Sequence, residues 1–355
     1  VLGLIFLKFT SDKFEKHRQA LITDGKEKYL DMVAFYQKDN VFFLSPESRW
    51  NYIMENAKQD DVAIKIDTAL FTIEKNNPIL KGALPDNYFS RLGMDASKLS
   101  SLLDTINNID TLKDEQQDIV GRVYEYFLSK FALAEGKGKG EFYTPKSIVN
   151  LIAELIEPYK GKIYDPACGS GGMFVQTAHF VEDHEHKNVN EAITVYGTEL
   201  KSNNTRLAKM NLAIHGIEGK IIEANSFYTN PHTPKLTGKC DFVMANPPFN
   251  VDKIDAKNKF LADDDRLPFG APLTGKGTIS NGNYLWMQYF HSYLNATGRA
   301  GFVMASSATD AGNAEMQYIW ARYNDKNKTN RDIATLKKYY TLAAAQNHAA
   351  AQCNL

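Results

Sequence analysis

The pattern of apolar and polar positions changes character near residue 160. Beyond that point, short apolar runs of strand length alternate with segments whose apolar residues recur at helical spacing. One helical segment has Met173, Thr177 and Phe180 on one face, and another runs from Ser202 to Gly216. The expected strands cover residues 162–165, 193–197, 220–224, 241–245 and 299–305. This alternation predicts a doubly wound α/β domain, a parallel sheet that binds ligands outside the carboxyl ends of its strands.

The N-terminal third of the chain has helical spacings but no recognisable chemistry. Its apolar opening, residues 1–7, is short and has no basic segment before it, so it predicts a buried helix rather than a signal peptide. A long helix is expected to break near Asp24–Gly25. A later helix is indicated by a stripe of apolar residues, which are Val120, Val123, Phe127, Phe131 and Ala134. Such stripes usually pack in a core or against a partner.

Three domains are expected from these changes of pattern. An all-helical interaction domain covers residues 1–134, the α/β domain covers 135–315, and a helical tail of uncertain continuity covers 316–355. The junction at 135–140 alternates glycine with lysine. It is typical of a flexible linker, and a loop that orders against cofactor or DNA phosphates is the open alternative.

Composition narrows the class of protein. The chain has 41 basic and 42 acidic residues among 355, so any attraction to DNA must be local or come from a partner. No apolar run reaches membrane-spanning length. Three scattered cysteines, Cys168, Cys240 and Cys353, favour the reducing cytoplasm and a chain without a disulfide framework. The pair His184 and His186 is typical of a solvated helix end, and no metal site is expected.

A glycine-rich turn follows the first expected strand of the α/β domain. Asp165 ends the strand, and Gly169, Ser170, Gly171 and Gly172 precede the next helix. Glycines allow close approach of a ligand to the backbone, and a helix N-terminus offers free N–H groups. The spacing departs from the G-x-G-x-x-G of dinucleotide folds. Alone, the turn is equally typical of an ordinary strand-to-helix connection.

A second polar segment follows a later strand. Asn246, Pro247, Pro248 and Phe249 come directly after the apolar run 241–245. Proline fixes its own φ and favours extended geometry in the residue before it, so the segment predicts a rigid set of hydrogen-bond acceptors beside an aromatic ring. A proline-rich turn after a strand is the plain structural alternative. The long segment 250–282 that follows has no clear periodicity and is typical of a lid or binding element.

A helix is also expected just before the glycine turn. Thr144 predicts an N-cap with Pro145 at the first helical position, and the apolar face would contain Ile148, Ile152 and Leu155. The N–H groups at its start would face an anion.

Taken in this order, the glycine turn and the Asn-Pro-Pro-Phe segment resemble those of amino-methyltransferases that make N6-methyladenine in DNA. The chain is most similar to the modification subunit of type I restriction-modification systems, including a Phe-Phe-Leu-x-Pro-Glu-x-Arg-Trp stretch that begins at Phe42. The resemblance extends to about Ala314. It implies a Rossmann-like, S-adenosylmethionine-dependent methyltransferase domain preceded by the helical domain.

The resemblance also implies the roles of individual residues. S-adenosylmethionine would be held at Asp165, at the glycine turn, at Glu199, which would accept the ribose hydroxyls, and at Asn225, near the adenine ring. The segment 141–146, which precedes the glycine turn, would close that pocket. Its residues are Glu141, Phe142, Tyr143, Thr144, Pro145 and Lys146. Asn246 and Pro247 would accept the two N6 hydrogens of a flipped adenine, on which Phe249 would stack.

The partners implied are DNA, a specificity subunit and a restriction subunit, in a hetero-oligomer with no membrane association. Because no segment resembles a module that reads DNA sequence, the specificity subunit would supply selectivity. Sites of this kind also methylate RNA bases and a protein glutamine, which remains the alternative substrate class. A catalytically silent scaffold is a further alternative, although the acceptor segment and the glycine turn are both intact.

Overall fold

The computed structural model describes residues 1–110, 144–185, 188–255, 257–258, 261, 264–268, 270–271, 279 and 281–304. The chain divides into two compact units. The helical unit comprises Val1–Tyr143, Gly169–Val175 and Asn203–Glu218, and the sheet unit comprises Thr144–Cys168, Gln176–Ser202 and Gly219–Leu355. The expected domain boundary near residue 134, the stripe 120–134, the junction 135–140 and the tail from 316 lie outside the described residues.

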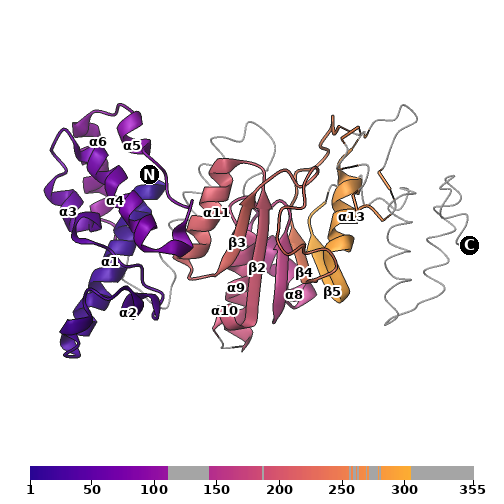
Figure 1. The fold of residues 1–355 in the computed structure, drawn as a ribbon, viewed down its shortest axis with the longest axis horizontal. Coiled ribbons are helices and arrows are strands. Elements are labelled where there is room, and N and C mark those ends of the chain that lie inside the picture. The colour runs from indigo at the N-terminus through magenta and orange to yellow at the C-terminus, as the bar shows by residue number, and fades with distance from the viewer. Residues whose placement is uncertain are drawn as a thin grey trace, which may run out of the picture. The chain divides into compact units, whose positions relative to one another are not determined.

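The helical unit is built on one long helix (Figure 1). Its helices are α1 (Leu2–Thr23), α2 (Val33–Gln37), α3 (Trp50–Glu55), α4 (Val62–Asn76), α5 (Tyr88–Arg91), α6 (Ala96–Asn107) and α11 (Ser202–Ile214). The apolar opening is a buried helix, as predicted, because Leu4, Ile5, Phe6 and Leu7 are all in the core. The predicted break is confirmed: α1 ends at Thr23, and Gly25 takes the left-handed φ of 67°.

The sheet unit contains a parallel sheet in the order β3-β2-β1-β4-β5 (Figure 1). Its strands are β1 (Gly161–Asp165), β2 (Ile193–Glu199), β3 (Gly219–Glu223), β4 (Cys240–Ala245) and β5 (Leu294–Phe302). All five predicted strands are present. The helices outside the helical unit are α8 (Lys146–Ile156), α10 (Val189–Ala192) and α13 (Asn283–Tyr293), while α9 (Gly172–Glu185) follows β1 in the chain. The fold is therefore α/β, as predicted.

The helix that precedes the sheet differs from the prediction. Its first residue is Lys146, so Pro145 occupies the N-cap position, and the Thr144 hydroxyl instead accepts a hydrogen bond from Asn246. The predicted apolar face is also wrong, because Ile148 and Leu155 are exposed. The helix is apolar on two sides. The side that packs is the set Val149, Ile152, Ala153 and Ile156, and Gly301 of β5 allows the close approach of Ile152.

Helix α13 fills the core of the sheet unit with aromatic side chains. Trp286, Met287 and Phe290 are buried, which confirms the prediction for these residues, and Tyr284 is half-buried. Tyr293 packs edge-on against Tyr164 of β1, with ring centroids 4.4 Å apart. Within the described residues, no helix is long and apolar enough to cross a membrane, and no group of acidic, histidine or cysteine side chains is suited to hold a metal.

Candidate functional site

Polar side chains gather where neighbouring parallel strands end. Asp165 is the last residue of β1 and Glu199 is the last residue of β2. Asn246 follows the last residue of β4, which pairs with β1 in the register that sets Tyr164 against Val243. Because the strands are parallel, all three side chains belong to one edge of the sheet. That edge is the place where doubly wound sheets bind ligands.

Asp165 is a buried carboxyl group with only part of its hydrogen-bonding capacity used. Its residue is 1% exposed, and its Oδ1 accepts a hydrogen bond from the Ala167 N–H at 2.9 Å. Burial raises the pKa of the Asp165 carboxyl to about 8, and the negative charge of Glu199 adds to the rise, while the Ala167 N–H lowers it. The edge therefore favours a positively charged group beside this carboxyl.

Glu199 is oriented by the backbone that follows it. Its Oε1 accepts a hydrogen bond from the Lys201 N–H at 2.9 Å, and the residue is 8% exposed. The strand approaches its neighbours closely here, since a Cβ on Gly197 would lie 2.7 Å from Ile221 and 2.8 Å from the Cys168 sulfur. Glycine at position 197 therefore keeps the ends of the strands together.

Near this edge, buried side chains form a series of hydrogen bonds that the sequence did not indicate. The Tyr164 hydroxyl is 2.9 Å from Thr198 Oγ1, which is 3.2 Å from His232 Nε2. Burial lowers the pKa of His232 to about 4, so this histidine is neutral at pH 7. These hydrogen bonds join β1, β2 and the segment after β3 near the candidate site.

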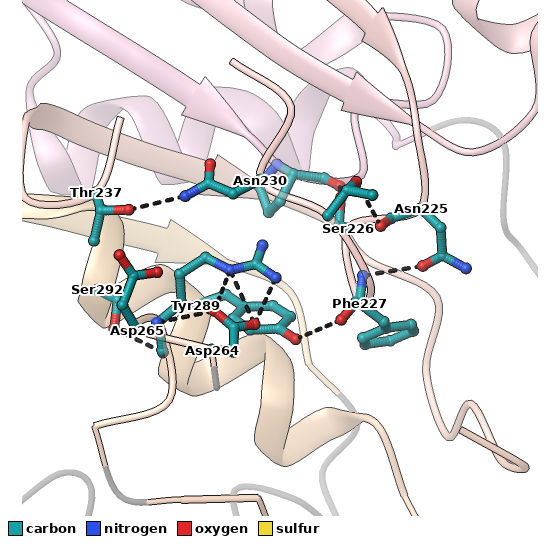
Figure 2. Close-up of polar contacts among 12 residues, drawn as sticks. Asn225, Ser226, Phe227, Asn230, Thr237, Asp264, Asp265, Tyr289 and Ser292 are labelled. Carbon is teal, nitrogen blue, oxygen red and sulfur yellow. Dashed lines mark hydrogen bonds and ion pairs between the residues drawn. The ribbon is translucent and has the colours of Figure 1, made fainter. Parts of the chain in front are cut away.

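The segment that follows β3, residues 225–227, is held in place by hydrogen bonds (Figure 2). Asn225 Oδ1 accepts from the Phe227 N–H at 3.0 Å, which forms a local turn. Ser226 Oγ donates to the Pro166 carbonyl at 2.5 Å. The Phe227 carbonyl accepts from the Tyr289 hydroxyl at 3.2 Å. Asn225 is thus placed beyond the end of β3, next to the segment that follows Asp165.

A buried ion pair lies against Tyr289, the residue whose hydroxyl contacts the Phe227 carbonyl. Sequence analysis did not predict this pair. The side chains of Asp264 and Arg266 are fully buried, with Arg266 Nη2 2.6 Å from Asp264 Oδ2. The guanidinium lies 4.1 Å from the ring centroid of Tyr289 and donates to the Tyr293 hydroxyl at 3.0 Å. Two residues that are only two positions apart thereby anchor part of the long 250–282 segment to α13. The acidic run 263–265 gave no signal of a buried charge.

The glycine turn belongs to the helical unit, where α11 supports it. Asn211 Nδ2 donates to the Ser170 carbonyl at 3.0 Å, and a Cβ on Gly171 would meet Ala208 at 3.4 Å. Gly169 and Gly171 have left-handed φ values of 53° and 78°. These conformations explain the glycines at both positions.

The Asn-Pro-Pro-Phe segment combines one fixed amide with one exposed ring. Asn246 Nδ2 donates to Thr144 Oγ1 at 3.0 Å, and no described residue donates to the Asn246 Oδ1. Pro247 is buried and Pro248 is half-buried, whereas Phe249 is 38% exposed. The segment therefore presents an amide oxygen and an aromatic face from a rigid backbone.

The remaining predicted site residues divide into two groups. Thr144 contacts Asn246, while Pro145 and Lys146 are exposed at the start of α8. Glu141, Phe142 and Tyr143 lie outside the described residues.

The fold matches that of known methyltransferases. The methyltransferase subunit of a type I restriction-modification system from Streptococcus thermophilus has a crystal structure that gives a TM-score of 0.69 at 22% identity, covering 90% of this chain and 73% of that one. The shared fold is an α/β domain with a parallel sheet. The pattern of the N-6 DNA methylase family matches residues 115–330, more than half of the chain, and that of the HsdM N-terminal domain matches residues 1–109. The chain belongs to the N-6 DNA methylase family.

Two curated relatives carry methylase names. The chain is 37% identical over 331 residues to the type I restriction enzyme MjaIX methylase subunit of Methanocaldococcus jannaschii, covering 89% of this chain and 58% of that subunit. It is 43% identical over 263 residues to the HindI methylase subunit of Haemophilus influenzae, covering 71% of this chain and 56% of that subunit. The chain thus spans a little over half the length of these relatives.

The raised pKa of Asp165 predicts a specific dependence of stability on pH. Between about pH 4, the ordinary pKa of an aspartate, and about pH 8, the folded chain keeps a proton that the unfolded chain releases. The free energy of unfolding should therefore fall as the pH rises through this range. In ligand-free protein, Asp165→Asn should remove that part of the slope in thermal unfolding. Asp183→Asn, which replaces an exposed carboxyl on α9, is the matched control. An unaltered slope in Asp165→Asn contradicts the assignment.

Proposed function

We propose that this chain transfers a methyl group from S-adenosylmethionine to N6 of an adenine that has been flipped out of DNA. The observation that carries the proposal is the shared edge of the sheet. Asp165 ends β1, and Glu199 and Asn246 lie at the same edge, at the ends of β2 and β4, the two strands that pair with β1. A cofactor and an acceptor base bound at that edge would be adjacent.

The residues at the edge fit a cationic adenosyl cofactor. A buried carboxyl whose proton is held to about pH 8 gains most from a nearby positive charge, and the cofactor has both an ammonium and a sulfonium group. The Glu199 carboxylate is suited to accept ribose hydroxyls, as acidic residues do at the matching edge of other nucleoside-binding sheets. Asn225 would contact the adenine ring. The bound cofactor would supply an electrophilic methyl group.

The chain's own chemistry is concentrated in Asn246, Pro247 and Phe249. The lone pair of adenine N6 is delocalised into the ring, and N6 cannot reach a methyl donor inside a duplex, so the base must leave the stack at a cost of a few kcal/mol. Phe249 would stack on the flipped base, a contact that contributes about 1–3 kcal/mol. Asn246 Oδ1 and the Pro247 carbonyl would accept the two N6 hydrogens and stabilise positive charge that develops on nitrogen.

Thr144 contributes by orienting the amide. Because its hydroxyl accepts from Asn246 Nδ2, the Asn246 oxygen is directed away from Thr144 and stays free for the substrate. No strong base is needed, since an alkylated amine is acidic enough to lose its proton to solvent. RNA adenine and a protein glutamine offer similar planar nitrogens, but membership of the N-6 DNA methylase family favours DNA.

The partners are part of the same proposal. The relatives are named as methylase subunits of type I restriction enzymes, and a near-neutral chain of this kind has no excess of positive charge for DNA. We infer that a specificity subunit supplies sequence selectivity, that a restriction subunit joins the same complex, and that the helical unit takes part in assembly.

Replacing the amide should separate chemistry from cofactor binding. In Asn246→Ala, methyl transfer should fall on the order of a hundredfold or more, because one preorganised acceptor is lost. S-adenosylmethionine affinity, measured by calorimetry, should be unchanged. Radiolabelled methyl transfer to DNA, to RNA and to a glutamine peptide identifies the substrate class in parallel. Near-normal turnover in Asn246→Ala would rule out this mechanism.

Selectivity for DNA sequence should depend on the specificity subunit. The chain alone should bind DNA weakly and without sequence preference, with an affinity that falls steeply as salt increases. Adding the specificity subunit should confine methylation to one sequence, as mapped by sequencing of methylated adenines. Efficient methylation of one defined sequence by the chain alone, at physiological salt, contradicts this division of labour.

A further inference from the structure

The segment that carries Asn246 and Phe249 is anchored at both ends by side-chain hydrogen bonds. At its start, Thr144 fixes the Asn246 amide. At its end, Asn250 is held by Asn283, the first residue of α13. The second anchor has no assigned role in binding or chemistry, and it joins residues 33 positions apart.

Asn283 contacts Asn250 through both ends of its amide. Its Oδ1 accepts from the Asn250 N–H at 2.9 Å, and its Nδ2 donates to the Asn250 Oδ1 at 3.0 Å. Asn281 donates to the same Asn250 oxygen at 3.0 Å and accepts from the Asn283 N–H at 2.9 Å. Three asparagines thus form a closed set of hydrogen bonds.

The hydrogen bonds among the three asparagines hold the backbone of Asn250 in one conformation. Asn250 has a φ of 55°, in the left-handed region, which asparagine enters more readily than other residues with a side chain. Asn283 can supply that restraint because it is 1% exposed and begins a helix in which Leu285 and Trp286 are in the core. The position of Asn250 is thereby tied to the core of the sheet unit.

Phe249 lies directly before the restrained residue Asn250. The residue is 38% exposed, and the place of its Cα is set by the backbone on either side. Pro247 and Pro248 stiffen the segment before it, and Asn250 is the residue directly after it. If Asn250 were released, Phe249 and the Pro247 carbonyl would lose their fixed place relative to an acceptor base.

We propose that Asn283 is a positioning residue for methyl transfer, which sets the geometry of the acceptor segment through Asn250. This role rests on the proposed adenine methyltransferase function. It assigns Asn283 to the acceptor side of the site, distinct from the strand ends Asp165 and Glu199. A loss of Asn283 should therefore act on the base and on the rate, and leave the cofactor in place.

The test uses Asn283→Ala in the assembled complex. The kcat is measured on DNA that has adenine at the target position, and base flipping is measured on a second DNA that carries 2-aminopurine there, which has no N6 amine to methylate. We expect kcat to fall on the order of tenfold to a hundredfold, as an ångström-scale misplacement does. The fluorescence that reports the flipped base should decrease, while the KM and calorimetric affinity for S-adenosylmethionine stay unchanged. A purely structural role predicts instead that stability and cofactor affinity fall together while kcat per folded molecule is kept.

Two further variants keep the proposal testable if Asn283→Ala does not fold. Asn250→Gly keeps the left-handed φ and the N–H bonded to Asn283 but removes the oxygen that both amides contact, so kcat should fall below the wild-type value while the affinity for S-adenosylmethionine is unchanged. Asn295→Ala is the matched control, because Asn295 Nδ2 donates to Asp241 at the start of β4, the opposite edge of the sheet. It should keep kcat and the fluorescence signal.

The outcomes separate this inference from the proposed function. If the wild-type complex does not methylate adenine, the proposed function fails. If the wild type methylates adenine while Asn283→Ala and Asn250→Gly both keep wild-type kcat and base flipping, the positioning role of Asn283 is wrong and the proposed function stands.

Discussion

The parallel pairing of β1 with β2 on one side and β4 on the other is the constraint on which the candidate site depends. It brings Asp165, Glu199 and Asn246 from three separate parts of the chain to one edge. Antiparallel pairing of any of these strands would send one of the side chains to the opposite edge. The small residue Gly197 supports the arrangement, since a side chain there would collide with Ile221 and Cys168. The site is therefore a consequence of strand direction and close packing.

The edge is also electrostatically divided. The end of β1 and the end of β2 contribute carboxyl groups. Burial raises the pKa of Asp165, and the negative charge of Glu199 adds to the rise. The end of β4 contributes an amide, two prolines and an aromatic ring, none of which is charged. A cation suits the first region and a neutral planar base suits the second. The two regions of this edge therefore differ in charge and would suit different ligands.

The sequence was sufficient for those features that depend on local pattern. The strands, the acidic strand ends and the Asn-Pro-Pro-Phe segment could all be placed, because strand runs and their terminal residues are contiguous in the chain. Thr144 was misassigned because a threonine before proline is typical of a helix N-cap, whereas its hydroxyl has a tertiary partner in Asn246. Contacts between distant residues, such as Asn283 with Asn250, leave no local pattern. The Asp264–Arg266 pair was missed because burial, not spacing, distinguishes it from a surface pair.

The claim that the carboxyl ends of β1 and β2 hold the cofactor is tested most directly by calorimetric titration of S-adenosylmethionine into the Asp165→Ala and Glu199→Ala variants. The account predicts that each variant binds the cofactor at least about tenfold more weakly than the wild type, which corresponds to about 1.4 kcal/mol. Wild-type affinity in both variants would contradict it.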